Sequence, residues 1–202
     1  MAKFTKRLMD LIISLLVLVI LIPVFIIIAL VIKVGDRGPV FFQQERIGLY
    51  GKKFSICKFR TMVVNAEKMG AGVFVEEEDT RITKAGKFLR HTSLDELPQL
   101  INILRGEMSL VGPRPTLPYQ VENYDHRQIK RLNVKPGVTG WAQINGRSSL
   151  SWPERIELDL WYIKNWSLWM DLKIIFKTLK VVLEKRNLYK TVNNDPISGK
   201  KP

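Results

Sequence analysis

The chain opens with one long apolar stretch and continues with shorter amphipathic segments. Residues 11–32 carry no charge, and as a continuous helix they would reach roughly 33 Å, enough to cross a bilayer core. Pro23 lies near the centre, where it removes a backbone donor and breaks the helix into halves about one leaflet deep. Basic residues flank both ends, and both flanks therefore favour the cytoplasm. The pattern predicts a re-entrant membrane helix over residues 1–34 that bends at Pro23, with an ordinary kinked span as the alternative.

Short apolar runs alternate with turn residues in the middle of the chain. Residues 39–42 and 54–59 are separated by Gly48 and Gly51, which predicts a small β-hairpin. Gly106 follows a helical pattern and predicts its end. Helices are expected over residues 61–69, 85–91 and 94–104, an extended segment over 110–118 and a turn over 135–140.

The C-terminal third has amphipathic helical periodicity. Residues 151–154, Ser-Trp-Pro-Glu, have the form of a capping box and predict a helix start, and a second helix is expected from about Ser167. Basic, apolar and tryptophan side chains together suit a helix lying in the membrane interface. A helix packed on the core with its lysines in water explains the pattern equally well. The charged stripe consists of Lys173, Lys177, Lys180 and Glu184, and the tryptophans are Trp152, Trp161, Trp166 and Trp169.

Composition narrows the class of protein. Lys and Arg number 32 against 19 Asp and Glu, a net charge of +13 over 202 residues, so the partners should be anionic. A hydrophobic share of 46% excludes a disordered basic tail. The single cysteine, Cys57, excludes an internal disulfide framework and fits a reducing compartment.

These features predict a mainly helical α+β protein with three parts. The re-entrant membrane helix hairpin over residues 1–34 precedes a domain over 35–186 with amphipathic interfacial helices. Residues 187–202 are expected to form a flexible C-terminal tail.

Asp95 and Glu96 are the first candidates for chemistry, and they allow two interpretations. Ser93 and Glu96 fit a capping box, or Asp95 caps a helix whose first turn holds Pro98, and either would explain both carboxylates without a function. The functional interpretation uses the same place, because a helix start also suits a phosphate. An aspartate there could act as a nucleophile toward phosphorus and form an acyl phosphate.

Cations near these carboxylates favour the functional interpretation. Arg114 lies between two prolines, and a rigid mount loses little entropy when it holds an anion. Each cation alone could be a surface charge, but the set predicts a phosphorylated ligand. The G-x-x-x-x-G-K-[ST] and G-x-G-x-x-G loops are absent from the sequence, which excludes a standard P-loop or dinucleotide fold. The candidates for phosphate or nucleotide binding are Lys58, Arg60, Arg90, Pro113, Arg114 and Arg147.

Eight short sequence motifs now make a family recognisable. On these motifs, and over residues 6–182, the chain resembles the bacterial sugar transferases, specifically the monotopic polyprenol-phosphate phosphoglycosyl transferases in their short catalytic form. The motifs are GPVFF (38–42), QERIG (44–48), KFRTM (58–62), ITKAG (82–86), SLDELPQL (93–100), MSLVGPRP (108–115), PGVTG (136–140) and QINGR (143–147).

The resemblance implies a reaction and roles for residues. Such enzymes move a phospho-sugar from a UDP-sugar to polyprenol (undecaprenyl) phosphate, release UMP and require Mg²⁺. Carried over, Asp95 becomes the nucleophile and the expected metal ligand, and Glu96 its partner, which either helps to deprotonate the lipid phosphate or orients Asp95. Pro113 and Arg114 correspond to the nucleotide-binding element, and Arg90 and Arg147 to positions near phosphates. The family's re-entrant helix turns at a Ser-Pro pair, whereas Ile22 precedes Pro23 here.

The resemblance also implies a place and partners. The expected location is the bacterial inner membrane, with the catalytic domain on the cytoplasmic face and against lipids of that leaflet. No nucleic-acid partner is expected, and a homodimer is compatible with the sequence. The donor sugar stays open among UDP-linked N-acetylated hexosamines and deoxy-diamino sugars. The alternative hypothesis is a non-catalytic, membrane-tethered basic module that binds nucleic acid or a protein.

Overall fold

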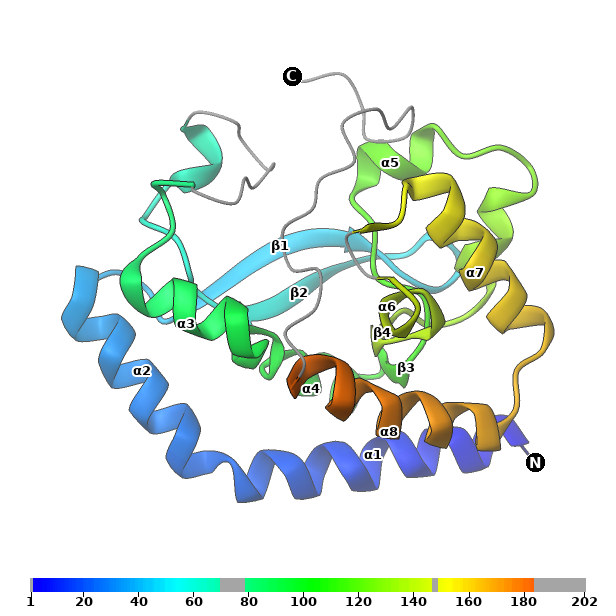
Figure 1. The fold of residues 1–202 in the computed structure, drawn as a ribbon, viewed down its shortest axis with the longest axis horizontal. Helices are drawn as coiled ribbons and strands as arrows, with labels where there is room; N and C mark the ends of the chain where they lie inside the picture. Colours follow the sequence, from blue (N-terminus) through cyan, green and yellow to red (C-terminus); the bar gives the residue numbers. More distant parts are fainter. Residues whose placement is uncertain (1, 70–78, 147–148, 184–202) are drawn as a thin grey trace.

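The computed structural model describes residues 2–69, 79–146 and 149–183. Two N-terminal helices lie along one side and one end of a mixed domain whose centre is a long β-hairpin (Figure 1). The expected mainly helical α+β class with a small antiparallel sheet is confirmed. The helices are α1 (Ala2–Ile20), α2 (Ile22–Asp36), α3 (Lys84–Thr92), α4 (Gln99–Arg105), α5 (Pro118–Glu122), α6 (Trp141–Ile144), α7 (Trp152–Lys164) and α8 (Leu168–Leu183). The strands are β1 (Phe41–Ile47), β2 (Lys53–Phe59), β3 (Ser109–Val111) and β4 (Gly137–Thr139), and the 3₁₀ turns are η1 (Leu49–Gly51), η2 (Ala66–Lys68), η3 (Leu94–Glu96) and η4 (Gln128–Asn133).

The predicted break in the apolar stretch is present, two residues earlier than expected. Helices α1 and α2 meet at Leu21 and are bent by 61°. Pro23 lies in the first turn of α2 rather than at the break, because a proline needs no backbone N–H donor there and its fixed φ suits a helix start. Among the described residues no single helix is long and apolar enough to cross a membrane, whereas the bent pair taken together passes that test.

Helix α1 is held on the domain by polar side chains. Lys6 Nζ lies 2.6 Å from Asp171 Oδ2 of α8, and Arg7 donates to the carbonyl of Ile103 at the end of α4. The buried carboxylate of Asp10 accepts the backbone N–H of Leu110. These contacts fix which face of α1 points outward.

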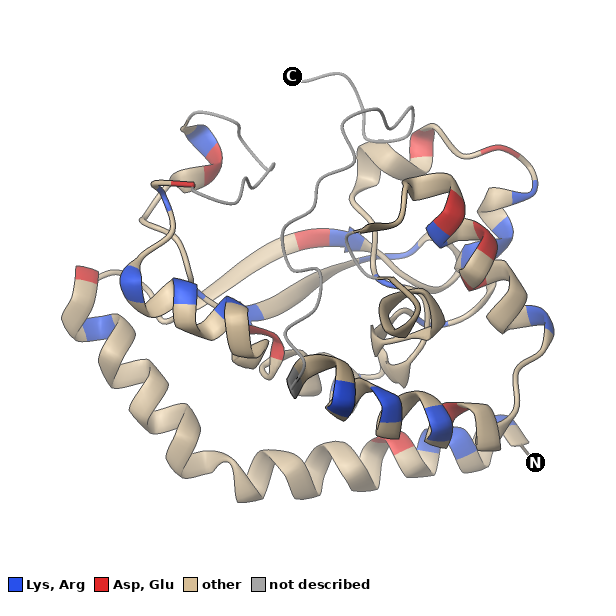
Figure 2. Cartoon of the chain, in the orientation of Figure 1, with Lys and Arg blue, Asp and Glu red and all other residues tan. Residues whose placement is uncertain are grey.

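The outward faces of α1 and α2 are almost wholly apolar, and Figure 2 shows that charges lie mainly near the outer ends of the pair. The inward face of α2 packs Ile28 and Ile32 against Phe59 of β2 and Leu89 of α3, with Leu94 beside them. One core cluster therefore joins the apolar helix pair to the turn that carries Asp95. The exposed side chains are Phe4, Leu8, Ile12, Leu15, Leu16, Val19, Ile20, Ile22, Ile26, Ile27, Leu30, Val31 and Val34.

The predicted β-hairpin is confirmed, and its first strand is longer than expected. Strands β1 and β2 pair antiparallel from Phe41 opposite Phe59 to Ile47 opposite Lys53. The polar residues of β1 concealed the strand in the sequence, since side chains alternate between an exposed and a half-buried face. Gly51 closes the turn with a positive φ of 77°.

Two predicted segments are wrong. Residues 61–69 form only the turn η2, because Met62 pairs with Ile82 in an extended bridge. Residues 135–140 contain strand β4, which pairs in parallel with β3. The glycines there permit close approach, since a Cβ on Gly137 would lie 2.1 Å from the backbone nitrogen of Gly112.

The other predicted helices are present with refined bounds. Helix α3 covers residues 85–91, and the helix expected over 94–104 is split into η3 and α4, with Pro98 at the N-cap of α4. Gly106 ends α4 with φ of 85°, as predicted. Residues 110–118 are extended at their start, in β3, and again at Thr116, which forms a β-bridge with Ile47, and at Leu117 (φ −75°, ψ 150°), before helix α5 begins at Pro118.

The capping box at Ser151 and Glu154 is confirmed at the start of α7, and α8 begins at Leu168. The expected separation of a basic stripe from an apolar face in α8 is only partial. Its three lysines share the exposed side with large apolar side chains, Trp169, Phe176 and Leu179. Glu184 and the predicted tail over 187–202 lie outside the described residues, and the domain division stays a prediction.

Candidate active site

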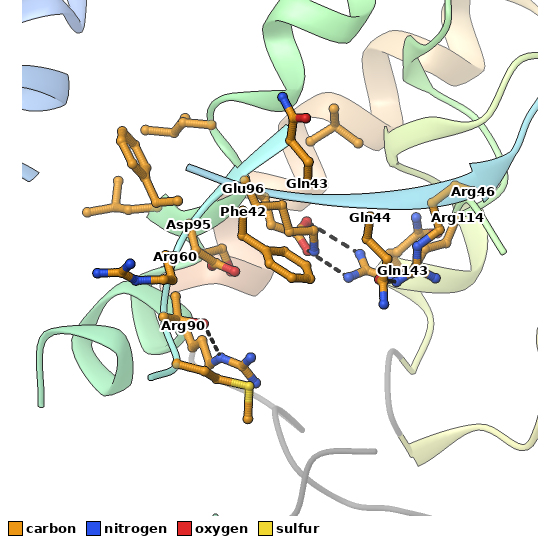
Figure 3. Close-up of a pocket in the computed structure, with 18 of the residues that line it drawn as sticks. Phe42, Gln43, Gln44, Arg46, Arg60, Arg90, Asp95, Glu96, Arg114 and Gln143 are labelled. Atoms are coloured by element: carbon orange, nitrogen blue, oxygen red, sulfur yellow. Dashed lines mark hydrogen bonds and ion pairs between the residues drawn. The ribbon is translucent and has the colours of Figure 1, made fainter. Parts of the chain in front are cut away.

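A cleft of about 1000 Å³ lies beside the β-hairpin and receives charged side chains from several elements. Strand β2 contributes Lys58. Turn η3 contributes Asp95 and Glu96, and the loop after β3 contributes Arg114 (Figure 3). The hairpin, η3 and this loop are far apart in the sequence. The fold therefore assembles one cationic site around the carboxylate pair.

The carboxylate of Asp95 is buried and has no hydrogen-bond or ion-pair partner within the described ranges. The residue is 9% exposed and lines the cleft. Ser93 positions it, because a left-handed conformation there (φ 58°) ends α3 and turns the chain directly into η3. Burial, together with the negative charge of Glu96, raises the pKa of Asp95 to about 6 against the pull of Lys58 and Arg90. At pH 7 Asp95 is mostly ionised, and protonation begins as the pH falls toward 6.

Glu96 is held in a different way from its neighbour. Its Oε1 accepts hydrogen bonds from Lys58 Nζ at 2.8 Å and Arg114 Nη2 at 2.6 Å, and Oε2 accepts from Arg114 Nη1 at 3.3 Å. Burial opposes its ionisation, but Arg114 and Lys58 outweigh burial and hold the pKa of Glu96 well below its usual range. Glu96 is therefore a fixed anion and a poor proton acceptor.

The capping interpretation of residues 93–98 is wrong. The side chain of Ser93 makes no capping hydrogen bond to η3, and Glu96 points to the two cations instead of the backbone. The N-cap of α4 is Pro98, which has no side-chain donor or acceptor. The two carboxylates thus do not serve as helix caps.

Arg114 sits on a loop that is fixed through its backbone. Arg131 Nη2 donates to the carbonyl of Arg114 at 2.9 Å, and Arg131 Nε lies 2.6 Å from Asp159 Oδ2 in a buried ion pair. Pro113 is buried, and its carbonyl accepts the N–H of Gly137 at 2.8 Å. Pro113 therefore belongs to the scaffold, while the guanidinium of Arg114 reaches the cleft.

The remaining predicted cations lie elsewhere. Arg90 lines the cleft and donates from Nε to Thr61 Oγ1 at 2.7 Å, at the Asp95 end (Figure 3). Arg60 also borders the cleft, but it pairs with Asp36 at the end of α2. Arg147 lies outside the described residues. The structure thus brings Lys58 and Arg114 to the carboxylate pair of Asp95 and Glu96. Arg90 and Arg60 bind other residues and lie apart from Glu96.

Two residues of the cleft were missed as site candidates. Arg46 is directed into it from β1 and donates to Gln44 Oε1 at 2.5 Å, and burial and the charge of Arg114 lower the pKa of Arg46 to about 10. Gln143 reaches the cleft from α6. Arg46 could have been identified from the alternation of side chains along a strand, because residues 42, 44 and 46 lie on the same face.

The donor set around Asp95 fits Mg²⁺ only in part. No cluster of three or more His, Cys, Asp or Glu side chains suited to a metal occurs in the described part of the chain. Mg²⁺ is commonly held by one or two carboxylates together with substrate phosphates and water. Asp95 offers one carboxylate without a partner in the part of the chain that the structure describes, whereas Glu96 is bonded to Lys58 and Arg114. The residues present therefore fit a Mg²⁺ whose other ligands would come from a bound diphosphate and water.

These features define a candidate enzyme with a carboxylate pair in a cationic cleft and a bent apolar helix pair packed beside it. The model of the family described as bacterial sugar transferase matches residues 1–185. This chain belongs to the bacterial sugar transferase family. The resemblance found in the sequence is thereby confirmed, and with it the prediction of a sugar-transferring enzyme.

Named relatives cover the chain almost completely. "Uncharacterized sugar transferase EpsL" of Bacillus subtilis (strain 168) is 46% identical over 186 residues, covering 92% of this chain and 91% of that protein. "UDP-galactose-lipid carrier transferase" of Erwinia amylovora is 42% identical over 202 residues, 93% of this chain and 42% of that protein. "UDP-glucose:undecaprenyl-phosphate glucose-1-phosphate transferase" of Klebsiella pneumoniae is 48% identical over 184 residues, which cover 86% of this chain and 39% of that protein. The chain spans less than half the length of the last two.

Proposed function

We propose that this chain transfers a phospho-sugar from a UDP-sugar to polyprenol phosphate, giving polyprenol-diphosphate-sugar and UMP. The names of the Erwinia and Klebsiella relatives, a UDP-galactose–lipid carrier transferase and a UDP-glucose:undecaprenyl-phosphate transferase, support both substrates. The observation that carries the proposal is the buried carboxylate of Asp95, which faces the cleft without a partner among the described residues. A carboxylate left bare at neutral pH beside several cations is poised for a phosphorylated electrophile.

The reaction proceeds in two displacements. An Asp95 carboxylate oxygen attacks the sugar-linked phosphorus of the UDP-sugar, and the bond from that phosphorus to the bridging oxygen breaks, so that UMP leaves with the electron pair. A phosphate oxygen of the polyprenol phosphate then attacks the same phosphorus, and the Asp95 carboxylate leaves. The enzyme is regenerated, and the diphosphate bond broken in the donor is replaced by one in the product.

Lys58 and Arg114 have an electrostatic role. A carboxylate approaching a diphosphate meets like charge, which at about 4 Å costs on the order of 4 kcal/mol near a protein surface. The two cations are already fixed by Glu96, so they need little rearrangement to stabilise charge on the leaving UMP. The family resemblance allows two roles for Glu96: a base that helps to deprotonate the lipid phosphate, or a partner that orients Asp95. The lowered pKa of Glu96 makes it a poor base and favours the orienting role.

Mg²⁺, when bound, would neutralise phosphate charge and polarise the phosphorus. Asp95 and the substrate oxygens would hold it, as the donor set indicates. Glu96 contributes its charge to the same region without leaving its two cations.

The apolar helix pair is proposed to enter and leave the bacterial inner membrane by its cytoplasmic face. The 61° bend and the exposed apolar faces of α1 and α2 support a shallow re-entrant insertion. Exposed Trp169 and Phe176 beside lysines on α8 support contact with the head groups of the same leaflet. Cysteines introduced at Lys3 and Arg37 should both be labelled only from the cytoplasmic side, and labelling from opposite sides would restore an ordinary span.

A UMP-release assay tests the function as a whole. With undecaprenyl phosphate and Mg²⁺ present, one or more members of a UDP-sugar panel should give sustained UMP release, and omission of either should stop it after at most one equivalent per enzyme. The panel includes UDP-galactose, UDP-glucose and UDP-linked N-acetylated hexosamines and deoxy-diamino sugars. Salt-sensitive nucleic-acid binding without UMP release from any donor would favour the binding-module alternative.

A further inference from the structure

Gln143 presents both atoms of its amide without a hydrogen-bond partner. Its Oε1 and Nε2 are shielded from bulk water, and neither is hydrogen-bonded within the part of the chain that the structure describes. The side chain nevertheless lines the cleft. A shielded amide with neither group satisfied is costly and rare in folded proteins, so it calls for an explanation by a ligand.

The short helix α6 fixes the position of this amide. Trp141 and Ile144 pack against the core cluster around Tyr162, and Ala142 is buried. Gly140, at the N-cap, leaves the space that the amide needs, because a Cβ there would lie 2.7 Å from Gln143 Oε1. The packing of α6 therefore fixes the position of Gln143, whose amide atoms have no hydrogen-bond partner among the described residues.

The order of groups along the cleft says which part of a UDP-sugar would meet Gln143. All of these residues line the cleft, and Figure 3 shows Asp95 to one side of Glu96 and Arg46, Arg114 and Gln143 to the other. The sugar-linked phosphorus must reach Asp95, so the second phosphate falls toward the arginines. The nucleoside then extends beyond them, toward Gln143, and the sugar extends the other way.

We propose that Gln143 recognises the uracil base of the donor through its imide edge, an inference that rests on the proposed function. Uracil carries an N–H donor flanked by carbonyl acceptors, and a primary amide offers the complementary acceptor and donor side by side. Gln143 Oε1 accepts from the base N3–H, and Nε2 donates to the adjacent carbonyl. Gln44 is not available for this, since its Oε1 is already bonded to Arg46.

The test pairs a change in the enzyme with a change in the ligand. UMP and 3-methyl-UMP, in which a methyl group replaces the imide hydrogen, are titrated calorimetrically into the detergent-solubilised full chain and into Gln143→Leu. Two neutral hydrogen bonds correspond to about a tenfold change in affinity. We expect wild type to bind 3-methyl-UMP about tenfold more weakly than UMP, and Gln143→Leu to bind both ligands equally at the weaker level.

Gln43→Leu is the matched control: Gln43 also borders the cleft, but it is exposed on β1 and points away from the arginines in Figure 3. It should keep the wild-type preference for UMP. Gln143→Glu keeps the size of the side chain, so it covers the case in which the leucine variant fails to fold; it loses the amide donor and should also bind UMP more weakly.

The possible results distinguish a wrong assignment of Gln143 from a wrong proposed function. If Gln143→Leu binds UMP as tightly as wild type, or still discriminates against the methylated base, the assignment of Gln143 is overturned while UMP release stands. If wild type neither binds UMP nor releases it from any donor, the proposed function fails and the inference fails with it.

Discussion

Asp95→Asn should abolish sustained transfer, lowering turnover on the order of a thousandfold or more. An amide is not nucleophilic enough to displace UMP, and it cannot form the acyl phosphate. The substitution should leave the fold intact, since the Asp95 carboxylate makes no hydrogen bond or ion pair in the described ranges and is buried. Binding of the UDP-sugar should survive, because Lys58, Arg114 and Gln143 are unchanged. Turnover is measured by UMP release and binding by titration of the donor.

The covalent step has its own measurement. Wild type incubated with the UDP-sugar and Mg²⁺, but without polyprenol phosphate, should accumulate a phospho-sugar adduct on Asp95, identified by mass spectrometry of the peptide that contains it. The Asp95→Asn protein should show none. Substantial activity in Asp95→Asn, or catalysis by wild type without any adduct at residue 95, would assign the nucleophile elsewhere.

Elements specified by neighbouring residues could be predicted from the sequence. The Ser151–Glu154 capping box, the stop at Gly106 and the hairpin turn around Gly51 each depend on contacts a few residues apart, and each is present in the structure. Prediction failed where the backbone conformation depends on contact with a segment far away in the sequence. Met62 is extended because it pairs with Ile82, and Gly137 belongs to a strand because Gly112 lies against it.

The candidate site divides in the same way. The sequence identified the residues Asp95 and Glu96, yet local spacing explained them equally well as helix caps. What distinguishes the interpretations is the partner of Glu96, and Lys58 and Arg114 lie 38 and 18 positions away along the chain. Gln143 could not be singled out at all, because its unpartnered amide is a property of the assembled cleft.

Replacing Arg131, whose buried ion pair with Asp159 supports the loop of Arg114, should greatly lower stability. Arg131 and Asp159 join η4 to α7, and each side chain is only 2% exposed. Arg131→Met leaves the carboxylate of Asp159 buried without its cation, which should lower the free energy of unfolding by about 3–5 kcal/mol. The matched control is Arg127→Met, because Arg127, the N-cap of η4, pairs with Glu157 of α7 and both side chains are largely exposed. That change should cost about 1 kcal/mol or less. Denaturant titration of the detergent-solubilised chain measures both.

The double variant Arg131→Met/Asp159→Leu separates stability from catalysis. It removes the buried charge of Asp159, so most of the lost stability should return, since apolar replacement of a buried pair is often nearly neutral. Turnover should stay low, because Arg131 is also the donor that holds the carbonyl of Arg114 at 2.9 Å, and methionine cannot replace it. Recovery of stability together with wild-type UMP release would mean that the loop of Arg114 keeps its position without Arg131. Loss of turnover with stability restored would show that the ion pair acts through Arg114, whose guanidinium holds Glu96 beside the nucleophile.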